Sequence, residues 1–128
     1  MERRLISSAM PWERTVGYSR AVVAGRHVYV SGTAPVMPGG ADPPADVYAQ
    51  AKRCLEIIGE ALREAGAGFE DVVRTRIFVT DPSFIEDVGR AHGEVFGEIR
   101  PASTCVVVKA LVDPRFRVEI EAEAVLSP

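Results

Sequence analysis

The segment 117–126, RVEIEAEAVL, alternates between apolar and acidic residues, and this alternation constrains the fold more than any other feature of the chain. Successive side chains of a β-strand point to opposite faces of a sheet, so a period of two predicts a half-buried strand. The apolar set is Val118, Ile120, Ala122 and Ala124, and the acidic set is Glu119, Glu121 and Glu123. The strand therefore needs a second layer on its apolar face and leaves a polar face uncovered.

A helix suited to cover that apolar face is predicted over residues 47–66, VYAQAKRCLEIIGEALREAG, where apolar residues recur at steps of three and four. Asp46 is its candidate N-cap and Gly66 its candidate stop. Cys54 lies on the apolar stripe, so we interpret it as a small core residue rather than a nucleophile. A second helix is predicted over residues 81–99.

The remaining strands have the β-branched and aromatic composition typical of sheets. They are a hairpin with arms 18–24 and 27–31 around Gly25, and the segments 71–81 and 100–111. The intervening residues 32–46 are dense in Pro, Gly and Asp and predict a loop. The resulting order, β-β-α-β-α-β-β, predicts an α+β fold with two helices on one face of a mixed sheet.

The uncovered face of that sheet is predicted to be polar. In RPASTCVVVKAL, residues 100–111, Ser103 and Cys105 alternate with apolar neighbours, and we expect them on the same face as the acidic side chains. Arg74 and Arg76 are expected there too, as ion-pair partners of Glu121 and Glu123. Such a face suits a subunit interface with wet clefts. A solvated face that carries ion pairs is the alternative.

Size and charge narrow the class of protein. The 128 residues fit one domain, 1–128, and the net charge of −3 without a Lys/Arg-rich run argues against nucleic acid as a partner. We expect no membrane span and no signal peptide, because no long apolar stretch occurs. The two cysteines and two histidines have no metal-ligand spacing, so we expect neither a metal nor a disulfide framework, and a cytoplasmic location.

Six segments, taken in order, resemble the RidA/YjgF family, also called endoribonuclease L-PSP or translation-inhibitor proteins. They are GYSRAV, VYVSGTAPV, AQAKRCLEIIGEALREAG, DVVRTRIFVTD, RPAST and VEIEAEAV. The resemblance implies a chorismate-mutase-like subunit and a homotrimer whose sheets face inward, with ligand clefts between subunits. It also implies hydrolysis of reactive enamines and imines to ammonia and 2-keto acids, with no metal or organic cofactor.

The family's site residues carry over in part. Glu119 matches the glutamate that helps to place the attacking water, and Tyr18 matches the cleft tyrosine, with packing of its ring at an interface as the alternative. Gly32 matches a backbone position that contacts ligand, or serves the geometry of a strand end. Cys105 matches a cysteine of the cleft. No base or cation is evident near this thiol, so we expect Cys105 to line the cleft and not to act as a nucleophile.

Two departures from the family bear on substrate choice. The deaminases carry Pro-Ala-Arg, whose arginine grips the substrate carboxylate with two hydrogen bonds, and here Ser103 follows Pro101 and Ala102. A serine gives one neutral hydrogen bond and cannot replace that charged fork. The family's asparagine in the second helix matches Gly89, and its tyrosine matches His92. The chain thus resembles the branch of the family that lacks the deaminase arginine.

Three arginines are candidates for the positive charge that the family's arginine would supply, and one histidine is a candidate for a titrating group. Arg20, Arg90 and Arg100 lie near these motifs, and one of them is a candidate cation, although a surface or interface role is the simpler interpretation of each. His92 has a side chain that titrates near neutral pH, with a structural role as the alternative.

Three functions follow from these observations. The first is an imine or enamine hydrolase with altered substrate preference. The second is a trimer that binds a small metabolite without turnover or assists a pathway enzyme. The third, an endoribonuclease, is disfavoured because the chain is acidic and lacks a basic, aromatic strip.

Overall fold

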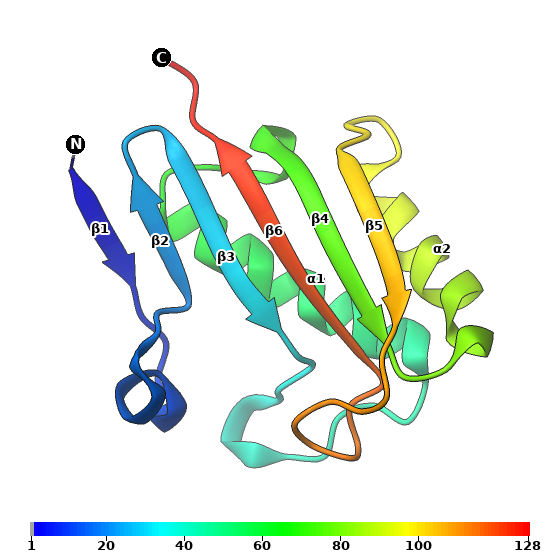
Figure 1. Cartoon of the computed structure of the whole chain (residues 1–128). Coiled ribbons are helices and arrows are strands. Elements are labelled where there is room, and N and C mark those ends of the chain that lie inside the picture. The colour runs from blue at the N-terminus through cyan, green and yellow to red at the C-terminus, as the bar shows by residue number, and fades with distance from the viewer. Residues whose placement is uncertain (1) are drawn as a thin grey trace.

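A six-stranded mixed sheet backed on one face by two helices forms the protein (Figure 1). The computed structural model describes residues 2–128. The strands and main helices are β1 (Arg3–Ile6), β2 (Ala21–Ala24), β3 (His27–Thr33), α1 (Val47–Glu64), β4 (Val72–Val79), α2 (Ile85–Phe96), β5 (Ala102–Val107) and β6 (Val118–Val125). Four short helical turns join them: η1 (Glu13–Gly17), η2 (Pro38–Gly40), η3 (Phe69–Asp71) and η4 (Pro82–Phe84). The predicted α+β fold is confirmed.

The strands lie in the order β1-β2-β3-β6-β4-β5, and all neighbours are antiparallel except β4 and β5. That parallel pair is joined through α2, which is the crossover connection that parallel strands need. β1 is an addition to the predicted order. It was not expected because RRLI is short and half charged, and its stability comes from pairing with β2. None of the helices in the described chain is long and apolar enough to cross a bilayer.

The core lies between the sheet and the two helices. The residues predicted to begin and to end α1 are confirmed in these roles. The side chain of Asp46 accepts hydrogen bonds from the backbone N–H groups of Tyr48 and Ala49, which caps α1. Gly66 follows α1 with φ +87°, a left-handed conformation that favours glycine. Cys54 is fully buried, as the apolar stripe predicted.

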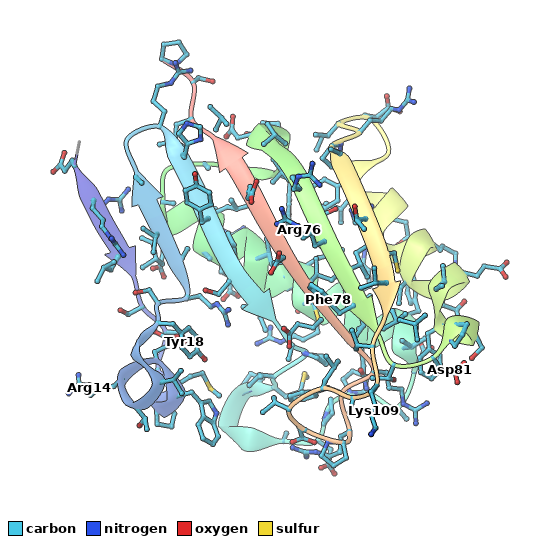
Figure 2. All side chains as sticks on the ribbon, in the orientation of Figure 1. Arg14, Tyr18, Arg76, Phe78, Asp81 and Lys109 are labelled. Carbon is cyan, nitrogen blue, oxygen red and sulfur yellow. The ribbon has the colours of Figure 1, made fainter. Side chains whose placement is uncertain are left out.

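The acidic face of β6 is the open face of the sheet. Along this strand buried and half-exposed residues alternate, with the glutamates on the half-exposed side. Arg76 of β4 forms ion pairs with Glu121 at 2.9 Å and with Glu123 at 3.3 Å, so this part of the prediction is confirmed. Figure 2 shows Arg76 and Phe78 on the side of the sheet that the helices do not cover.

The placement of Ser103 and Cys105 on that open face was wrong. In the β4–β5 ladder Ser103 pairs with Thr75 and Cys105 pairs with Ile77, and both partners are buried beneath the helices. Residues paired in register project to the same face, so Ser103 and Cys105 point toward α2. The alternation within 100–111 was read correctly, but valines occur in both alternating sets. The sequence therefore did not fix which set faces the helices.

Candidate functional site

The first group of candidate residues gathers around the carboxylate of Glu119, near the start of β6. This carboxylate lies over Gly32 of β3, and a β-carbon at Gly32 would overlap Oε2. Burial raises the pKa of Glu119 above its ordinary value, and the positive charge of Arg20 opposes that rise. The charged form of Glu119 is therefore less favourable than that of an exposed glutamate, which makes its carboxylate a stronger base.

Arg20 is the cation of this group. Its Nη2 donates a hydrogen bond of 2.6 Å to the carbonyl oxygen of Gly32, and its buried Nε has no hydrogen-bond partner within residues 2–128. Burial lowers the pKa of Arg20, and the nearby Tyr18, Glu13 and Glu119 oppose that shift. An arginine remains charged through such shifts. Its contact with Gly32 therefore places a fixed positive charge beside the strand end that supports Glu119.

Tyr18 stands at the rim of the first group. It follows the η1 turn, and its backbone N–H donates a hydrogen bond of 2.9 Å to the carbonyl oxygen of Glu13. Figure 2 shows its side chain beside the end of β2 nearest η1. The ring is 39% exposed, so its hydroxyl is available to a ligand or to a neighbouring subunit.

The second group lies on the other side of the sheet, between β5 and α2. The hydroxyl of Thr75 on β4 is 2.8 Å from Ser103 Oγ and 2.8 Å from His92 Nε2. The His92 ring packs against Phe96 with centroids 4.6 Å apart, and burial lowers the pKa of His92. Sequence reasoning missed Thr75. Its position between Arg74 and Arg76, which face the open side, was the signal for a buried hydroxyl that needs partners.

Cys105 and Gly89 extend the second group. The Cys105 thiol is exposed, and partial burial raises its pKa, with no cation acting to lower it. A β-carbon at Gly89 would meet no atom within 4 Å, so open space lies beside α2 one turn before His92. The surface beside Ser103 and Gly89 is thus neutral and roomy.

Arg90 and Arg100 do not supply a cation to either group. Arg90 lies over the ring of Tyr48, 3.9 Å from its centroid, and pairs with Asp87 at 3.5 Å. Arg100 is exposed between α2 and β5, where it has a left-handed φ of +56°. Of the three arginines considered from the sequence, only Arg20 contacts a candidate site residue.

One chain does not bring the two groups together. Glu119 projects from the open face of the sheet, whereas Ser103 projects from the helix-covered face at the β5 edge. Two hollows elsewhere on the surface involve neither group. One is lined by the loop at Asp42 and by Arg115, and the other lies along α1 near Arg53 and Phe69. Over residues 2–128, no cluster of three or more His, Cys, Asp or Glu side chains is arranged to hold a metal ion.

Comparison with known proteins adds to this geometry. The family model described as endoribonuclease L-PSP matches residues 9–126. The structure of Rv2704 from Mycobacterium tuberculosis, described as a member of the YjgF/YER057c/UK114 family, is 46% identical and superposes with a TM-score of 0.88, covering 98% of this chain and 100% of the other.

Two further relatives carry functional information. The 2-iminobutanoate/2-iminopropanoate deaminase of Capra hircus is 36% identical over 127 residues, which is 98% of this chain and 92% of the relative. The structure of Escherichia coli TdcF with bound serine is 31% identical, with a TM-score of 0.81, and the match covers 97% of this chain and 94% of that one.

Proposed function

The chain belongs to the endoribonuclease L-PSP family, also called the RidA/YjgF family, and on that premise we propose that it hydrolyses a reactive imine or enamine in a cleft between subunits of a homotrimer. The substrate preference differs from that of the arginine-bearing deaminases because Ser103 stands at the arginine position. We expect no metal or organic cofactor to be needed. The two free thiols fit action in the reducing cytoplasm.

The observation that carries this proposal is the division of the family-matched residues between opposite faces of the sheet. The Glu119 group and the Ser103 group meet only if the open face of one copy lies against the β5 edge of another. Both surfaces have the character of an interface. β5 is an edge strand that pairs only with β4 in the described chain and is exposed throughout. The open face carries half-exposed apolar side chains, those of Leu5, Tyr29 and Val106.

The proposed chemistry uses Glu119 as the general base. Glu119 takes a proton from water as the water oxygen forms a bond to the imine carbon. The proton then passes to the nitrogen, which gives a carbinolamine. Glu119 next takes the proton of the new hydroxyl and delivers it to the nitrogen, so that the carbonyl forms as the C–N bond breaks and ammonia leaves. The raised pKa of Glu119 makes its carboxylate a stronger base and favours the uptake of this proton. Tyr18 and the backbone at Gly32 orient the substrate, and Arg20 limits how far the Glu119 pKa rises.

The second group sets which imine is accepted. Ser103 is neutral, Gly89 leaves open space, and the second group contains no arginine whose charged fork could grip a carboxylate. An amino-acid-sized ligand is supported by the relative TdcF, whose structure contains bound serine. We therefore propose a substrate of that size whose reacting end lacks a carboxylate or carries a bulkier group in its place.

The test is ammonia release from freshly generated imines. 2-Iminopropanoate, made in place by an amino-acid oxidase, is compared with imines of similar size that have no carboxylate, and Glu119→Gln serves as the inactive control. Faster release from the uncharged imines, lost in Glu119→Gln, supports the proposal. Release from every imine at the uncatalysed rate would overturn the hydrolase assignment.

A binding protein without turnover is the second candidate, because the Ser103 hydroxyl is already hydrogen bonded to Thr75 and brings no charge to the cleft. Calorimetry with small 2-keto acids and amino acids separates the two functions. Binding with no ammonia release from any imine would favour the second candidate.

A further inference from the structure

Three side chains of the second group form a continuous chain of hydrogen bonds from the protein interior to its surface. Thr75 is fully buried, and its hydroxyl lies 2.8 Å from both His92 Nε2 and Ser103 Oγ. Ser103 is exposed on the β5 edge, and His92 is a half-buried residue of α2. The proposed hydrolysis makes no use of Thr75 or His92.

The protons in this chain allow only two consistent arrangements. Each hydroxyl has one proton to donate, and a ring nitrogen is either a donor or an acceptor. If His92 Nε2 carries a proton, it donates to Thr75, Thr75 donates to Ser103, and the Ser103 proton is free to point outward. If Nε2 carries none, Ser103 donates to Thr75, Thr75 donates to Nε2, and Ser103 presents only lone pairs.

We propose that His92, acting through Thr75, decides whether Ser103 donates or accepts the hydrogen bond to a ligand in the cleft. This inference deepens the proposed function and rests on it. With Nε2 protonated, Ser103 suits an acceptor such as a carbonyl or carboxylate oxygen. With Nε2 bare, Ser103 suits an N–H donor such as an iminium or ammonium group. His92 and Thr75 are therefore specificity-determining residues of this site.

The surroundings of His92 leave its proton free to respond to the ligand. Burial is the cause of its lowered pKa, and no charged group contributes to the shift. The ionisable groups on the elements around His92 are engaged elsewhere or lie on other elements. On α2, Asp87 pairs with Arg90, and Glu94 pairs with Lys52 of α1. The others are Glu70 and Asp71 on η3, Arg74 and Arg76 on the open face of β4, and Cys105 on β5. In the proposed trimer, Arg20 and Glu119 of a neighbouring copy would face the chain of hydrogen bonds as well.

The lowered pKa fixes the sign of the pH dependence. Around neutral pH His92 is uncharged, so both tautomers are available and the ligand selects between them. As the pH falls through the His92 pKa, both ring nitrogens become protonated and Ser103 is locked as a donor. Acceptor ligands should therefore bind more tightly in acid, and donor ligands more weakly.

The first experiment measures the tautomer of His92 by ¹⁵N NMR in the intact protein without ligand. The chain has two histidines, and exposed His27, which stacks on Tyr29, is the internal reference. Ser103→Ala does not touch His92 and removes the Ser103–Thr75 hydrogen bond from both arrangements. In the Nε2–H arrangement the buried Thr75 proton is then left without an acceptor, whereas in the other arrangement Thr75 still donates to Nε2 and only a lone pair is left unpaired. Because an unpaired buried donor costs more than an unpaired lone pair, we expect the Nε2–H tautomer to fall about threefold or more relative to Nδ1–H.

The control is Thr104→Ala, the next residue on β5, which pairs with Arg76 and points to the opposite face. It should leave the His92 tautomers unchanged. An unchanged tautomer ratio in Ser103→Ala would overturn the proposal, whatever the protein's activity.

The second experiment adds ligand probes and uses Thr75→Val, which keeps the buried volume but breaks the chain of hydrogen bonds. Saturating pyruvate should raise the Nε2–H fraction and ethylammonium should lower it, and both responses should vanish in Thr75→Val. Responses that persist in Thr75→Val would show a through-space effect and overturn the proposal. If neither probe perturbs the Ser103 and Cys105 amide signals, the proposed ligand class is wrong, and the first experiment still decides on the hydrogen-bond chain.

Discussion

The carboxylate of Glu119 occupies the space directly over Gly32 that a β-carbon would fill. Gly32 is not among the glycines with a positive φ, so its backbone conformation is one that any residue can adopt. A side chain is therefore excluded at this position by the carboxylate and not by backbone strain. The glycine matters because it lets a catalytic candidate on β6 lie against β3, next to the Arg20 hydrogen bond.

Gly32→Ala should leave the fold intact and displace Glu119. The obstructing atom is the free end of a flexible side chain, so the carboxylate moves and the backbone stays. We expect the free energy of unfolding to change by no more than about 1 kcal/mol, and imine hydrolysis to fall roughly tenfold to a hundredfold, because a displaced catalytic group loses its alignment. The stability control is Gly93→Ala, which adds the same group in open space on α2. Unaltered hydrolysis in Gly32→Ala would contradict a catalytic role for the Glu119 position.

Ser103→Arg should restore hydrolysis of 2-iminopropanoate. An arginine fork on a desolvated carboxylate is worth about 2–5 kcal/mol. If much of this interaction energy is expressed in the transition state, kcat/KM should rise by about two to three powers of ten. β5 is exposed at this position, so the longer side chain fits without core rearrangement.

The matched control is Thr104→Arg, which adds the same charge to the same strand on the opposite face. Equal gains in both variants would show a general charge effect. An inert Ser103→Arg would point to Gly89 as a second missing contact and favour the binding protein.

Phe78→Glu should dissociate the assembly. Phe78 lies on the open face and pairs with Glu119 on one side and Val106 on the other, so it is central to the proposed interface (Figure 2). A buried carboxylate there would lack a partner. Sedimentation velocity at micromolar concentration should give a trimer for the parent and for Glu60→Lys on the outer side of α1, and smaller species for Phe78→Glu. A monomeric parent would refute the intersubunit cleft.

Glu119 should make the protein less stable as the pH rises. Its pKa is raised in the folded state, from an ordinary value of 4.5, so its contribution is fully present below the unfolded pKa and is lost as the pH rises through the folded pKa. Relative to Glu119→Gln, the parent should therefore lose stability between acid and neutral pH. Urea unfolding midpoints from pH 4 to 7.5, at one fixed protein concentration, measure this difference. If the parent instead gained stability relative to Glu119→Gln over this pH range, the charge of Arg20 would have a larger effect on the Glu119 pKa than burial does.

The two thiols should differ sharply in reactivity. Cys54 is fully buried, and burial raises its pKa far above the ordinary range, whereas Cys105 is exposed and partial burial raises its pKa. Iodoacetamide at pH 7 should modify Cys105 alone, and more slowly than free cysteine, because the thiolate is the reactive form. Mass spectrometry of the folded protein follows this, and both thiols should react in urea. Rapid labelling of Cys105 would indicate a nearby cation and reopen its role as a nucleophile.

Local patterns in the sequence were sufficient for most of the fold. The alternation in β6, the stripe of α1 and the cap at Asp46 depend on residues close together in the chain, so they predicted the elements and the layer of helices. The ion pairs of Arg76 followed from the same alternation. β1 was not predicted, because a pattern of four residues, two of them charged, is too weak to indicate a strand. Its position in the sheet depends on pairing with the free edge of β2.

The class of fold, the family resemblance and the candidate site residues could be predicted from the sequence, because they depend on residue types and short spacings. The face that each strand turns to the helices could not be predicted in this way. That choice follows from strand register between segments far apart in the chain, which local alternation does not fix. It placed Ser103 with Thr75 and His92, and Glu119 with Gly32 and Arg20, on opposite sides of one sheet.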